Sequence, residues 1–144
     1  MAFSLSSIFK SRKEASTPVE TPKIEYKGGT KFATNDTNEV YLDLEELGGY
    51  PYIKTVIIGD FSTKIKRAGC TLTFLFKKDQ LTLDSDNTDI ESNQIKKAGI
   101  YYTEIDFELN EEEAEKIKKN PITEIQYSFK NKVISFSPIR PNIQ

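Results

Sequence analysis

Histidine and tryptophan are absent from this 144-residue chain, and cysteine occurs once, as Cys70. Without histidine the chain lacks the commonest general base, the imidazole metal ligand and the histidine-activated nucleophiles. One cysteine forms no internal disulfide, so the sequence does not call for an oxidising compartment. These absences weigh against enzymatic chemistry. We expect a protein that is not an enzyme and that needs no cofactor.

Long apolar runs are missing as well. Stretches such as Val56–Ile58 are far shorter than the roughly 20 residues of a membrane-spanning helix. The first ten residues lack the basic start and the continuous apolar stretch of a secretory signal. We therefore expect a cytoplasmic protein without a transmembrane segment.

No excess of one charge sign marks the chain. Lys and Arg number 20 against 22 Asp and Glu, which gives a net charge of -2. Such a balance provides no general attraction to the phosphate backbone, so we expect no nucleic-acid partner.

What the chain does contain is typical of one folded domain preceded by a tether. Hydrophobic residues make up 37% and charged residues 29%, values typical of globular proteins. Residues 1–10 read as an amphipathic leader, and residues 11–22, rich in Ser, Thr, Glu and Pro, as a flexible linker. Residues 23–140 have the length and patterning of a single β-rich globular domain.

Apolar residues alternate with polar ones along several segments, which predicts strands. The clearest are Cys70–Phe76 and Ile100–Leu109, while the short β-branched run Ile53–Gly59 indicates a central strand. Hairpins are expected at residues 70–83 and 122–136. Residues 40–47 fit both an alternating strand and a helical stripe, and we favour the strand.

One short helix is expected at about residues 110–119. Asn110 is a good N-cap residue and Glu113 completes a capping box. Glu111 and Glu112 lie at the positive end of the helix dipole, and lysines occupy the last turn. Because few apolar residues mark its face, we expect this helix to cover a sheet edge.

The order of these elements predicts an α+β fold, mainly antiparallel β, with the helix before the last two strands. A single rolled sheet, a sandwich and a half-open barrel fit the pattern equally well.

The leader is the candidate binding segment. Its apolar side chains are Phe3, Leu5, Ile8 and Phe9, and the last three would share one face of a helix. Burying such side chains in a partner groove contributes about 1.5–3 kcal/mol each before ordering costs. Docking onto a partner is therefore the proposed role of the leader, and the alternatives are a chain terminus without a role and a shallow membrane contact.

An acidic loop spaces oxygen atoms as a calcium loop does. Its candidate ligands for Ca²⁺ or Mg²⁺ are Asp84, Asp86, Asp89 and Glu91. The EF-hand pattern requires Gly and Glu where this loop has Asp89 and Ile95. An ordinary exposed loop is the favoured interpretation, and an irregular cation site the alternative.

Two further features have ordinary structural interpretations. Glu104, Asp106 and Glu108 share one strand face, and that pattern favours a solvated outer surface over paired catalytic carboxylates. Cys70 faces the same way as Leu72, which predicts a buried, unreactive thiol.

The sequence as a whole favours a non-enzymatic protein-interaction module, either a subunit of a larger assembly or an inhibitor of another protein. The expected partner is another protein, with a second copy of the chain as one candidate. Two alternatives remain: a small carboxylate-based metal-dependent hydrolase, and a carrier of a small apolar ligand.

Overall fold

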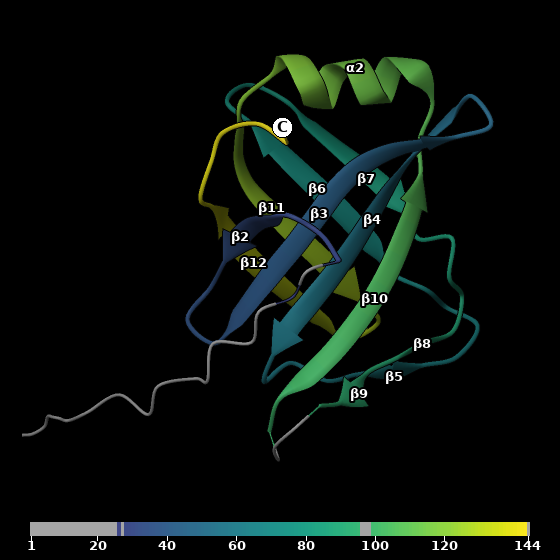
Figure 1. Cartoon of the computed structure of the whole chain (residues 1–144), viewed down its shortest axis with the longest axis vertical. Helices are drawn as coiled ribbons and strands as arrows, with labels where there is room; N and C mark the ends of the chain where they lie inside the picture. Colours follow the sequence, from purple (N-terminus) through teal and green to yellow (C-terminus); the bar gives the residue numbers. More distant parts are fainter. Residues whose placement is uncertain (1–25, 27, 96–98, 144) are drawn as a thin grey trace, which may run out of the picture.

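The computed structural model describes residues 26, 28–95 and 99–143, and one curled nine-stranded sheet dominates it (Figure 1). The sheet runs in the order β7-β6-β11-β12-β2-β3-β4-β10-β9, with a separate pair β5-β8. The strands of the large sheet are β2 (Lys31–Thr34), β3 (Asn38–Leu47), β4 (Tyr50–Gly59), β6 (Thr71–Phe76), β7 (Gln80–Asp84), β9 (Asn93–Gln94), β10 (Tyr101–Glu108), β11 (Ile122–Phe129) and β12 (Lys132–Pro138). The small pair is β5 (Lys64–Ile65) with β8 (Ile90–Glu91), and the helix is α2 (Glu111–Lys119).

The expected α+β class with antiparallel pairing is confirmed, and among the three candidate architectures the sheet forms a half-barrel. β12 pairs with β2 through Ser137↔Thr34, which joins the last hairpin to the first one. This pairing makes the sheet continuous, so its natural twist can roll it around one interior.

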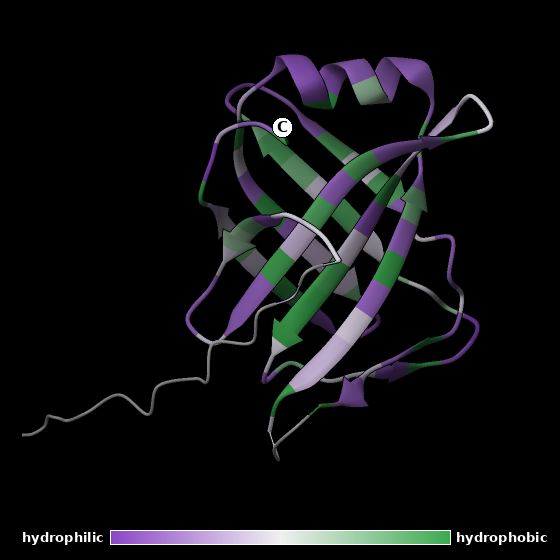
Figure 2. Cartoon of the chain, in the orientation of Figure 1, coloured by the Kyte–Doolittle hydropathy of each residue, from purple (hydrophilic) through white to green (hydrophobic). Residues whose placement is uncertain are grey.

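Alternation along the strands fills that interior. Figure 2 shows hydrophobic and hydrophilic residues alternating along β10, where Ile105 and Phe107 are fully buried and Glu104 is exposed. The Tyr127 ring packs on Phe107 and Phe136, with centroid separations of 6.3 and 5.8 Å. Aromatic rings therefore occupy the space between the walls, which gives the apolar-carrier alternative no support.

Residues 40–47 belong to a strand, as favoured. β3 pairs with β4 over ten residues, from Asn38↔Gly59 to Leu47↔Tyr50. Such a long ladder satisfies the backbone of both strands, so it outweighs the helical stripe in the same residues.

Beyond β7 the chain reaches the other side of the barrel. Ser85 forms an isolated bridge with Phe107 of β10, and Asp86 N donates to Asp106 O at 2.8 Å. The segment after β7 thereby ties the β7 end of the sheet to β10.

The helix is capped as predicted but covers a different part of the sheet. Asn110 Oδ1 accepts from Glu113 N at 2.8 Å, and Glu113 Oε1 accepts from Asn110 N at 2.9 Å. Ile117 is fully buried in the main core, and α2 lies across one open end of the curled sheet (Figure 1). The expectation that it covers a sheet edge is wrong, because a rolled sheet exposes core side chains at its ends as well as along its edges.

Within the described ranges, no helix combines the length and the hydropathy needed to cross a membrane.

Candidate functional site

The tip of the β3–β4 hairpin carries two exposed apolar side chains. Gly48 and Gly49 have φ values of 60° and 85°, as a tight two-residue hairpin turn requires. The turn places Leu47 directly opposite Tyr50, and these side chains are 73% and 77% exposed. A hairpin tip in water normally carries polar residues, so this pair is a candidate contact surface.

Beside the tip lies a groove of about 660 Å³. It is formed by the hairpin tip, the end of β10 and the segment after β7, and its lining residues are Leu47, Tyr50, Pro51, Tyr52, Asp86, Asp106, Glu108 and Leu109. Apolar side chains therefore meet three carboxylates in one concavity. We call this concavity the hairpin groove.

The outer face of β3, β4 and β10 continues the acidic character of the hairpin groove. Strand register places Tyr52 between Glu45 and Glu108. The Tyr52 hydroxyl donates to Glu45 Oε1 at 3.0 Å, and this hydrogen bond is the main reason that the pKa of Tyr52 is raised. The predicted solvated face thus exists, and it extends onto β3.

One row further along, Lys54 lies between Asp43 and Asp106. Among the described residues, Asp106 Oδ1 is buried and has no hydrogen-bond partner. Burial raises the pKa of Asp106, the Glu104 charge raises it further, and Lys54 opposes both effects. Asp106 therefore presents a carboxylate whose hydrogen-bonding capacity is only partly used.

The acidic loop uses its side chains to hold backbone groups. Asp86 Oδ1 accepts from Glu108 N at 3.1 Å, and Asn87 Oδ1 accepts from Asp106 N at 2.9 Å. Asp89 Oδ1 accepts from Arg67 N at 2.8 Å. These hydrogen bonds therefore position β10 and the segment around Arg67.

The candidate cation ligands in this loop were Asp84, Asp86, Asp89 and Glu91. In the part of the chain that the structure describes, no three or more Cys, Asp or Glu side chains are placed to hold a metal ion. The geometry gives the cation site no support, and it stays a prediction.

The four apolar leader residues, Phe3, Leu5, Ile8 and Phe9, lie outside the described residues. Tyr26, where description begins, packs on the outer face of the sheet. Its ring contacts Tyr41 and Tyr102 at centroid separations of 5.0 and 5.7 Å. The described chain therefore starts on the same three-strand face that carries the acidic rows.

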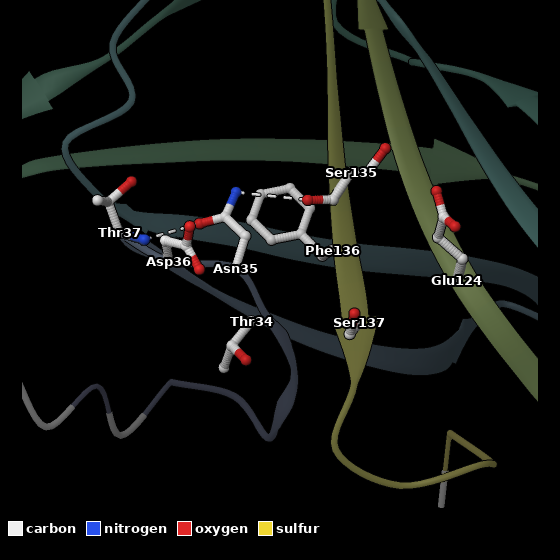
Figure 3. A pocket seen from close by; sticks show the side chains of 8 residues that line it. All are labelled: Thr34, Asn35, Asp36, Thr37, Glu124, Ser135, Phe136 and Ser137. Atoms are coloured by element: carbon white, nitrogen blue, oxygen red, sulfur yellow. Dashed lines mark hydrogen bonds between the residues drawn. The ribbon is translucent and has the colours of Figure 1, made fainter.

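A second concavity, of about 450 Å³, lies between the β2–β3 turn and strands β11 and β12 (Figure 3). Asn35 spans it: its amide nitrogen donates to Ser135 O at 3.4 Å, and its Oδ1 accepts from Thr37 N at 3.0 Å. One of these bonds ties the turn to β12 and the other lies within the turn, so this pocket resembles a filled structural junction more than a binding site.

Cys70 is buried, as predicted. Burial raises the pKa of its thiol to about 12, while a hydrogen bond with Ser85 acts in the opposite direction. Such a thiol stays protonated at neutral pH and is a poor nucleophile.

Sequence reasoning missed the hairpin groove. Leu47 and Tyr50 flank a Gly-Gly turn, and that pattern alone could have indicated an exposed apolar tip. Asp86 and Leu109 reach the tip only through the closure of the sheet, which the sequence does not display.

No protein-family model matches the chain, and comparison with curated proteins and with solved structures gave no significant match.

Proposed function

We propose that this chain is a non-enzymatic protein-interaction module whose docking surface is the hairpin groove. The observation that supports this proposal is the exposure of Leu47 and Tyr50 beside three carboxylates. Exposed apolar patches rimmed by charge are typical of protein-interaction sites.

The chemistry of the hairpin groove selects the class of partner. Apolar side chains would cover Leu47 and Tyr50, and lysine or arginine would meet Asp106 and Glu108. An acidic surface repels phosphate backbones, so a protein segment suits it better than nucleic acid. The single buried thiol of Cys70 supports a cytoplasmic location.

A peptide array tests this function. Each 12-residue peptide would combine two apolar residues, three or four positions apart, with neighbouring lysines. A matched peptide would carry glutamate in place of each lysine. We expect the full-length chain to bind the basic set about tenfold more tightly, measured by fluorescence anisotropy.

The double substitution Leu47→Ser and Tyr50→Ser should weaken binding of the basic set about tenfold, because it removes the apolar contacts. The pair Val133→Ser and Ile139→Ser is the matched control, because these side chains are 60% and 52% exposed but do not line the hairpin groove. Equal binding by the wild type and the Leu47/Tyr50 variant would refute the proposed docking surface.

A further inference from the structure

We propose that the hairpin groove is occupied, within the same molecule, by the chain's own N-terminal segment, residues 3–13. This inference rests on the proposed function, because it takes the groove to be a docking surface. It adds the identity of the occupant and a regulatory consequence.

The segment and the hairpin groove are chemically complementary. The segment offers four apolar side chains, Phe3, Leu5, Ile8 and Phe9, followed at once by the cations Lys10, Arg12 and Lys13. The hairpin groove offers Leu47, Tyr50 and Leu109 beside the carboxylates of Asp86, Asp106 and Glu108. The segment and the groove thus both combine apolar side chains with charges, and the charges are of opposite sign.

The buried Oδ1 of Asp106 has, among the described residues, no hydrogen-bond partner. A carboxylate oxygen without a hydrogen-bond donor costs free energy, and a lysine or arginine supplies donors together with the opposite charge. Lys54 lies opposite Asp106 on β4, but the same lysine also faces Asp43 on β3. A cation from the segment would relieve this acidic row.

The chain between the segment and Tyr26 is long enough for the segment to contact the hairpin groove. Tyr26 packs on Tyr41, and Leu47 lies six residues further along β3, which is about 20 Å of strand. Sixteen residues lie between Phe9 and Tyr26 in the sequence, and a random-coil chain of that length spans about 22 Å on average. The tether therefore matches the distance.

Docking within one molecule follows from the same numbers. A tether of this length holds its end at an effective concentration on the order of millimolar, well above the usual concentration of free chains. A partner with the same chemistry must displace the segment first, so its apparent affinity falls in proportion to the fraction of open grooves. The leader would thus regulate access to the groove.

Limited trypsin digestion of the full-length chain tests this inference. Trypsin cleaves after Lys10, Arg12 and Lys13, and cleavage after Lys23 provides an internal reference outside the proposed docked segment. In the Leu47→Ser, Tyr50→Ser variant we expect cleavage at the first three sites to be about tenfold faster than in the wild type. That factor is the ratio of a millimolar effective concentration to a dissociation constant near 0.1 mM. Cleavage at Lys23 should not change.

Two further variants guard against loss of folding, which circular dichroism would report. Glu108→Lys alters only an exposed side chain of the groove and should also accelerate cleavage at the three sites. Val133→Ser, on another strand, should leave every site at the wild-type rate.

Equal cleavage rates in the wild type and in both groove variants would overturn the inference. So would protection that grows with protein concentration, because it indicates docking onto a second copy. Neither result touches the proposed function, since the peptide array reads the hairpin groove independently. A groove that fails the array while the segment stays protected would instead refute partner docking alone.

Discussion

The neighbours of Asp106 compensate its negative charge poorly. One carboxylate oxygen is buried and, among the described residues, has no hydrogen-bond partner, while Glu104 and Asp86 contribute charge of the same sign. Lys54 offsets part of this repulsion. The folded protein therefore favours the protonated form of Asp106 more than the unfolded chain does, which means that the pKa of Asp106 is raised in the folded state.

The sign of the resulting pH dependence follows by linkage. A carboxyl whose pKa is raised by folding binds its proton more tightly in the native state, so stability falls as pH rises above about 4. In the Leu47→Ser, Tyr50→Ser background, where the segment is not expected to dock, Asp106→Asn should increase the free energy of unfolding at pH 7, because the substitution removes a charge that no docked cation offsets. At pH 3 both proteins are neutral at this position, and the difference should vanish.

Urea denaturation at the two pH values measures this effect. Glu46→Gln is the control, because Glu46 is an exposed hairpin carboxylate. Its substitution should leave stability unchanged at both pH values. A parent variant as stable as its Asp106→Asn derivative at pH 7 would show that the buried oxygen costs no free energy of folding.

At the scale of elements, local sequence rules predicted most of the structure. The Asn110 capping box, the hairpin of β6 with β7 and the hairpin of β11 with β12 all form where the pattern placed them. Residues 40–47 were ambiguous because their apolar positions fit both periods, and only the partner strand β4 resolves them. Local patterns specify an element well when its partner is adjacent in sequence.

The helix cap gives a prediction at this scale. Removing the Asn110 side chain leaves Glu113 N without its acceptor, so Asn110→Ala should lower the free energy of unfolding by about 1 kcal/mol. Asn110→Asp keeps the acceptor oxygen and adds a favourable charge at the helix N-terminus, so it should match or exceed the wild type. Urea denaturation at pH 7 compares the three proteins. Equal stability of wild type and Asn110→Ala would show that α2 does not depend on its cap.

At the scale of the whole molecule, the sequence left a rolled sheet, a sandwich and a half-open barrel undecided. Alternation along a strand is the same in all three, because it reports which face is buried and not which strands become neighbours. The pairing Ser137↔Thr34 joins segments about a hundred residues apart in the chain, and no local pattern marks it.

The same limit explains the hairpin groove. Leu47 and Tyr50 come from one hairpin, Asp86 from the loop after β7, and Asp106 and Glu108 from β10. The sequence shows the types of these residues, and the acidic face of β10 was predicted from it. The sequence could not predict that these residues lie in one groove, because that depends on how the two ends of the sheet meet.

The loop after β7 contacts β10 where the two ends of the sheet meet. Asp86 and Asn87 accept hydrogen bonds from the backbone N–H groups of Glu108 and Asp106, in place of a neighbouring strand. Asn87→Ala should lower the free energy of unfolding by about 1–2 kcal/mol, because it leaves a partly buried backbone N–H of β10 without its acceptor, and Asp86→Ala by about 0.5–1 kcal/mol, because its bond is exposed and water can replace it. Asp86→Asn keeps an acceptor oxygen and should stay close to the wild type. Hydrogen exchange should accelerate at the two β10 amides in the alanine variants, and unchanged protection there would show that the sheet closes without this loop.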